Sequence, residues 1–128
     1  MCLLARTALF IHLQIEQQPP HCAGATHPGV DLELLVYGVD PLILRQRYPV
    51  RDAPYGLAGS SKLAWVSQTA INTVVGYDLA TGIPVEKVRY RTVQQPNSLA
   101  FDEASGTLYV VSGSGAGVQV IPNAGVSR

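Results

Sequence analysis

The sequence predicts an all-β fold made of repeated antiparallel units of four strands, and three observations support this prediction. Short runs rich in β-branched and aromatic residues, such as Thr107–Ser112, are bounded by turn-forming residues. No segment after residue 29 has the 3.6-residue periodicity of a helix. The sequence also repeats with a period of about 42 residues. Because four short strands in about 40 residues is the spacing of one propeller blade, we predict a partial β-propeller with about two four-stranded blades and one leading strand.

Residues 1–29 differ in character from the rest, and we expect them to form a disordered or irregular leader outside the core. The apolar run Leu3–Leu13 is interrupted by Arg6 and His12, and no Lys or Arg precedes it. It is therefore a poor signal peptide, and it is too short to cross a membrane as a helix.

Both cysteines and all three histidines of the chain also lie in this leader. His21, Cys22 and His27 form a short cluster, but a fourth ligand at regular spacing is missing. We therefore predict no metal site and no cofactor, and the absence of histidine further along argues against a Ser–His–acid catalytic arrangement there.

Residues 30–128 form the predicted partial propeller, with repeats at about 43–84 and 85–125. With three residues inserted in the intervening turn, Leu63–Ser67 also aligns with Leu108–Ser112. The matched pairs at a shift of 42 include Arg45 with Lys87, Arg47 with Arg89, Tyr48 with Tyr90, Pro54 with Pro96, Leu57 with Leu99 and Ala58 with Ala100.

Each repeat is expected to begin with an outer strand that carries most of the charge, Ile43–Val50 or Val85–Val93. The strand nearest the axis follows, at Tyr55–Ala58 or Ser98–Phe101. Polar turns separate the later strands: Asp78 can accept a backbone N–H in its turn, while the glycine that ends the turn can take positive φ.

Three segments resemble the YVTN-type β-propeller repeat, a relative of the NHL and lactonase-like propellers: Pro96–Asp102, Ser105–Ser112 and Val75–Gly82. The resemblance covers roughly residues 30–125 and implies a scaffolding or ligand-binding role, at or beyond the bacterial cell envelope. It departs from the family pattern at Ile121–Gly125, where the turn Asp is missing.

Basic residues gather on the predicted outer strands, where they could form a ridge for an anionic polymer. The alternative is that edge strands use charge to remain soluble, and the formal net charge of zero favours that reading. The ridge residues are Arg45, Arg47, Lys87, Arg89 and Arg91.

Asn97 and its counterpart Tyr55 are the candidate ligand contacts, because both adjoin the strand expected to lie nearest the axis. A buried hydrogen bond is the plainer role for Asn97. Asp78, Asp102 and Glu103 occupy turn positions, where a carboxylate serves the backbone rather than catalysis or calcium binding.

These observations predict a non-enzymatic propeller scaffold or binding module, as a fragment of a larger propeller, with no catalytic residue. The alternative is a remnant or subunit of a lactonase-like or lyase-like enzyme. Two blades leave apolar faces uncovered, so the expected partner is a second copy or another propeller chain, unless the chain is a truncated product. No nucleic acid is expected.

Overall fold

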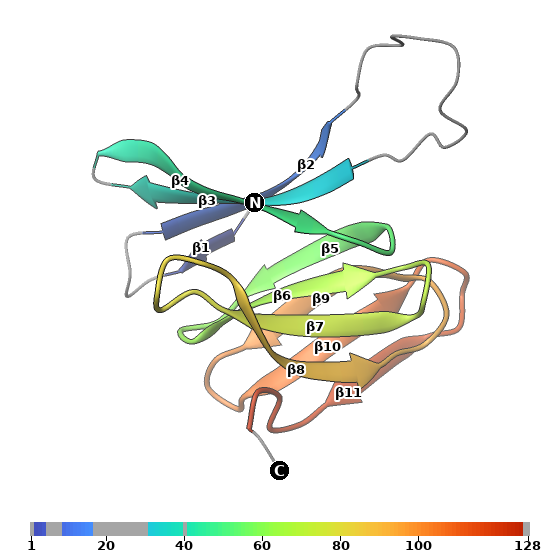
Figure 1. The fold of residues 1–128 in the computed structure, drawn as a ribbon. Coiled ribbons are helices and arrows are strands. Elements are labelled where there is room, and N and C mark those ends of the chain that lie inside the picture. Colours follow the sequence, from blue (N-terminus) through green and yellow to red (C-terminus); the bar gives the residue numbers. More distant parts are fainter. Residues whose placement is uncertain (1, 5–8, 17–30, 40, 127–128) are drawn as a thin grey trace, which may run out of the picture.

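The computed structural model describes residues 2–4, 9–16, 31–39 and 41–126, and it confirms the all-β prediction (Figure 1). The strands form three antiparallel sheets in which strands that neighbour in the sequence pair with each other. The first sheet contains β1 (Cys2–Leu4), β2 (Leu9–Glu16), β3 (Asp31–Val39) and β4 (Leu42–Val50). The second contains β5 (Pro54–Gly59), β6 (Leu63–Gln68), β7 (Thr73–Asp78) and β8 (Val85–Arg91). The third contains β9 (Pro96–Asp102), β10 (Thr107–Ser112) and β11 (Val118–Ile121).

The first sheet differs from the expectation of a single leading strand after an irregular leader. β3 pairs with β2 along its length, and β1 pairs with β2, so residues 2–4 and 9–16 belong to a sheet. The sequence signal is the alternation of aliphatic residues with others along Leu9–Glu16, which is typical of a strand. The rest of the predicted leader, apart from these two strands, lies outside the described residues.

Each repeat found in the sequence begins one strand earlier than a sheet does. The strand that opens a repeat is the last strand of the preceding sheet in the structure. The outer strands β4 and β8 pair with the strand before them, so they close one sheet before the next begins. The cross-strand pairing also shows that the sequence alignment of Leu63–Ser67 with Leu108–Ser112 is wrong by one residue. Leu57 faces Val66 and Leu99 faces Val110, and Trp65 therefore corresponds to Tyr109 rather than to Val110.

Two apolar clusters hold the three sheets together, and β6 contributes to both. Ala64 and Val66 point to the first sheet, whereas Leu63 and Trp65 point to the third. Every residue of β6 is buried, which explains why this strand does not alternate between apolar and polar residues. The first cluster comprises Leu34, Val36, Val50, Ala64, Val66, Val75, Tyr77 and Leu79. The second comprises Ala58, Leu63, Trp65, Val74, Leu108, Val110 and Ala124.

Tyr77 in the first cluster predicts a loss of stability at high pH. Its side chain is 4% exposed and meets the ring of Tyr48 edge-on, with the ring centroids 5.6 Å apart. Burial, with a smaller contribution from Tyr48, raises the pKa of Tyr77 from 10.0 to about 12. The folded state therefore holds the phenol proton more tightly, and this contribution to stability is complete below pH 10 and is lost as the pH rises towards 12. We expect it to be about 2 kcal/mol.

Denaturant unfolding at several pH values measures this effect in the wild type and in Tyr77→Phe. The difference between the two proteins isolates Tyr77 from the other groups that titrate in the same range. Tyr109→Phe is the matched control, because Tyr109 is 36% exposed. If wild type and Tyr77→Phe lose stability equally between pH 10 and 12, the prediction is wrong.

Candidate functional site

The inner strands β5 and β9 lie side by side and carry the two predicted ligand contacts. A Cβ built on Gly56 would lie 2.5 Å from the backbone oxygen of Asn97, so the two backbones are in contact. Asn97 is partly buried with its amide against Gly113, whereas Tyr55 is 68% exposed. The structure thus brings their strands together, and a role for Asn97 and Tyr55 in ligand binding stays a prediction.

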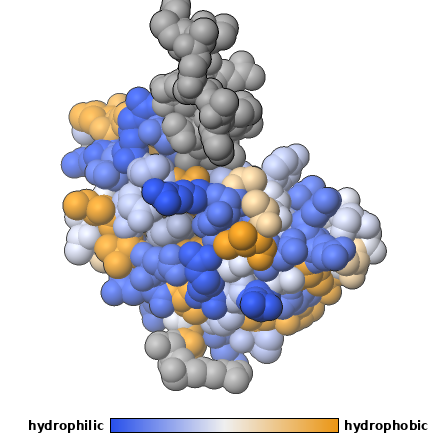
Figure 2. All heavy atoms as spheres, turned by 45° about the vertical axis from the view of Figure 1, so that its right-hand side comes forward, coloured by the Kyte–Doolittle hydropathy of each residue, from blue (hydrophilic) through white to orange (hydrophobic). Residues whose placement is uncertain are grey.

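The predicted basic ridge is interrupted by carboxylates. Arg47 forms an ion pair with Glu33 at 2.7 Å, and Arg89 pairs with Glu86 at 3.0 Å. The hydrogen bond from Arg89 lowers the pKa of Glu86 and raises that of Arg89. These pairs suit the reading in which charge keeps edge strands soluble, and Figure 2 shows hydrophobic patches scattered among hydrophilic residues on the face it displays.

The predicted turn role of the aspartates is confirmed. Asp78 Oδ1 accepts a hydrogen bond from the backbone N–H of Ala80 at 2.8 Å, and Gly82 has a φ of 82°. Asp102 likewise serves its own hairpin, where hydrogen bonds, chiefly from the Ser105 hydroxyl and then from the Ala104 N–H, lower its pKa. Across the part of the chain that the structure describes, no three His, Cys, Asp or Glu side chains group to hold a metal ion.

One face of the third sheet is apolar and exposed; the sequence predicted an uncovered apolar face but not that it lies on this sheet. Tyr109 lies opposite both Ala100 and Val120, and Val111 lies opposite Val118, so these side chains form one continuous face. The exposed fractions of the four large side chains on this face range from 36% for Tyr109 to 59% for Val118. The available signal in the sequence was the run Val118–Ile121, in which Val118 and Val120 alternate with Gln119 and Ile121.

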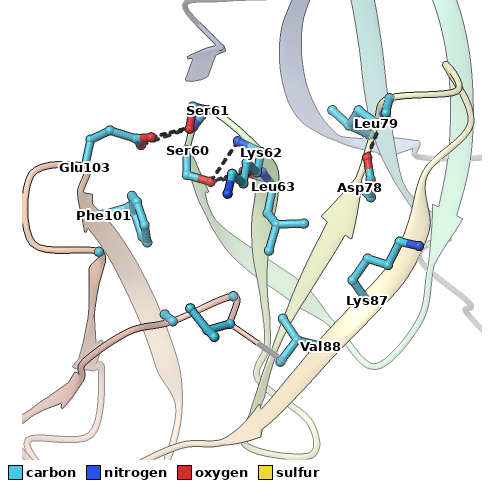
Figure 3. A pocket seen from close by; sticks show the side chains of 15 residues that line it. Ser60, Ser61, Lys62, Leu63, Asp78, Leu79, Lys87, Val88, Phe101 and Glu103 are labelled. Atoms are coloured by element: carbon cyan, nitrogen blue, oxygen red, sulfur yellow. Dashed lines mark hydrogen bonds between the residues drawn. The ribbon is translucent and has the colours of Figure 1, made fainter. Parts of the chain in front are cut away.

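A cavity of about 660 Å³ opens between the second and third sheets, at the end where the β5–β6 and β9–β10 hairpins lie (Figure 3). Glu103 closes one side of it, because both of its carboxylate oxygens accept the backbone N–H of Ser61, at 3.1 and 3.2 Å. The apolar part of the lining comprises Leu63, Leu79, Ala80, Val88, Phe101, Ala124 and Val126. The charged part comprises Lys62, Asp78, Lys87 and Glu103.

Membrane-spanning helices are likewise not found: within the described ranges, no helix combines the length and apolar character that crossing a bilayer requires.

Comparison with known proteins identifies the fold. No protein-family model and no curated protein sequence has a significant match to this chain. Among solved structures, Kuenenia stuttgartiensis hydrazine synthase, which contains β-propeller domains, matches with a TM-score of 0.65 and 15% sequence identity. The match covers 91% of this chain and 42% of the hydrazine synthase chain, so this chain spans less than half the length of that relative. At this identity the likeness shows the fold alone, which is part of a β-propeller.

Proposed function

We propose that this chain is a non-enzymatic segment of a YVTN-type β-propeller that serves as a binding scaffold. The observation that carries this proposal is the exposed apolar face of the third sheet. Apolar faces of this kind on soluble domains mark sites of interaction. The YVTN assignment rests on the repeat motifs in the sequence, such as Ser105–Ser112.

The second sheet has a corresponding apolar face, and that face is buried against the third sheet. Trp65 and Ala58 lie on its corresponding face, and the third sheet covers both of them. Tyr109 and Ala100 take the same register positions on the third sheet, yet Tyr109 is 36% exposed whereas Trp65 is fully buried. The partner that fits this surface is therefore a further propeller sheet, from a second copy or from another propeller chain.

Sedimentation velocity over a range of concentrations tests the proposal. We expect the wild type to self-associate reversibly, because the apolar face is open, and Val111→Lys/Val120→Lys to remain monomeric. Val85→Lys is the matched control, since Val85 is 43% exposed but lies on the outer strand β8, and this variant should associate like the wild type.

Two results would overturn the proposal. One is a wild-type chain that remains a monomer at all concentrations and unfolds cooperatively, because the face would then need no partner. The other is hydrolysis of simple lactones that a chelator abolishes, which would identify an enzyme instead of a scaffold.

A further inference from the structure

The chain has only two lysines, Lys62 and Lys87, and both line the cavity between the second and third sheets. The other residues counted as positively charged at pH 7 are all arginines. Lys62 comes from the β5–β6 hairpin and Lys87 from the outer strand β8, so the two lysines lie on different sides of the cavity (Figure 3). An ammonium group is a compact point charge that binds anions with three rotatable donors.

A β-bulge accounts for the presence of Lys87 at the cavity. Gly76 faces Val88 and Tyr77 faces Glu86, which leaves Lys87 as the extra residue between them. Bulges of this kind redirect side chains and occur often beside functional sites. Glu86 and Arg89 pair with each other through their side chains, whereas Lys87 lines the cavity together with Val88.

The charges around the cavity differ in whether they already have partners. Glu103 accepts the N–H of Ser61, and Asp78 accepts the N–H of Ala80. The ammonium groups of Lys62 and Lys87 have no hydrogen-bond or ion-pair partner among the residues that the structure describes. The two cations are therefore the groups that remain available to a ligand.

The wall between the lysines is apolar, with Leu63 and Leu79 at its buried part and Phe101 at one side. The volume of about 660 Å³ lies in the range of small-molecule sites. We propose that this cavity binds a small amphipathic carboxylate, whose anionic group contacts Lys62 or Lys87 at the rim and whose apolar body lies against the apolar wall that includes Phe101. This site is separate from the apolar face of the third sheet.

Octanoate, below its micellar concentration, is the probe for this proposal, and the wild-type chain offers two readouts. The single tryptophan, Trp65, stacks on Phe101 with the ring centroids 6.1 Å apart, so binding should change its fluorescence. An amine-reactive reagent, followed by mass spectrometry, should label at least one of Lys62 and Lys87 more slowly when octanoate is present. Octanamide, which lacks the charge, should bind about tenfold more weakly.

Variants localise the binding to the lysines. Lys62→Gln/Lys87→Gln should weaken octanoate binding about tenfold. The charge-matched control Arg51→Gln/Arg91→Gln should bind like the wild type, since neither arginine lines the cavity. Binding should also persist when the apolar face of the third sheet carries its two lysine substitutions. Octanamide binding as well as octanoate, or octanoate leaving the labelling of both lysines unchanged, would overturn the proposal.

Discussion

Replacing Trp65 with alanine will lower the free energy of unfolding by about 4 kcal/mol. The side chain is fully buried and lies between two rings, those of Tyr90 and Phe101, each with its centroid 6.1 Å away. Phe101 belongs to the third sheet, so the truncation removes the largest side chain at the interface between the second and third sheets. Urea unfolding followed by circular dichroism measures the change, since the variant has no tryptophan to report fluorescence.

Tyr109→Ala is the matched control, because Tyr109 occupies on β10 the register position that Trp65 occupies on β6. Tyr109 is 36% exposed and faces away from the second sheet. In dilute solution its truncation should lower the free energy of unfolding by only about 1 kcal/mol, through its cross-strand contacts with Ala100 and Val120. Similar losses for the two variants would show that register position, rather than coverage by a neighbouring sheet, determines the cost.

The Trp65 indole also has an unsatisfied donor, since its Nε1 is buried and has no hydrogen-bond partner in the described part of the chain. Trp65→Phe should therefore cost much less than Trp65→Ala. The phenyl ring keeps most of the apolar contact and removes a buried donor whose hydrogen bond to water was lost on folding.

The strands of the second and third sheets were predictable because their signals are local. β-branched runs and turn residues place a strand at Thr107–Ser112, and the structure has β10 at the same bounds. The strand predicted at Leu63–Ser67 is β6, one residue longer. The turn carboxylates Asp78 and Asp102 were also predictable, since each bonds to a backbone N–H two residues later.

The pairing of strands and the position of the cavity were not predictable in the same way. Leu108 to Val111 are all large and apolar, so a shift of one residue leaves the sequence alignment almost equally good, and only the cross-strand register reveals it. Lys87 reaches the cavity through a bulge, which depends on how β8 pairs with β7. The exposed face likewise depends on which side of β10 meets the second sheet, and this is a tertiary property.

Substitution of Gly56 with alanine should lower the free energy of unfolding by about 3 kcal/mol. Among the substitutions proposed, only Trp65→Ala is expected to cost more. Gly56 is a buried residue of β5, and its N–H donates to the hydroxyl of Ser67 at 2.7 Å. A Cβ there would lie 2.5 Å from the carbonyl oxygen of Asn97 and 2.9 Å from Ser67 Oγ. The first of these atoms is backbone, so β5 and β9 would have to move apart.

Further variants separate the sources of this loss in the same urea experiment. Ser98 takes on β9 the place of Gly56 on β5 and is exposed, so Ser98→Ala should change stability by less than about 0.5 kcal/mol. Because Ser67→Ala also removes the acceptor of the Gly56 N–H, the double variant Gly56→Ala/Ser67→Ala is compared with Ser67→Ala alone. In that background the contact with the Asn97 carbonyl remains, so Gly56→Ala should still cause most of its loss. If Gly56→Ala costs nothing in that background, then Ser67, rather than the close approach of the two inner strands, excludes a side chain at Gly56.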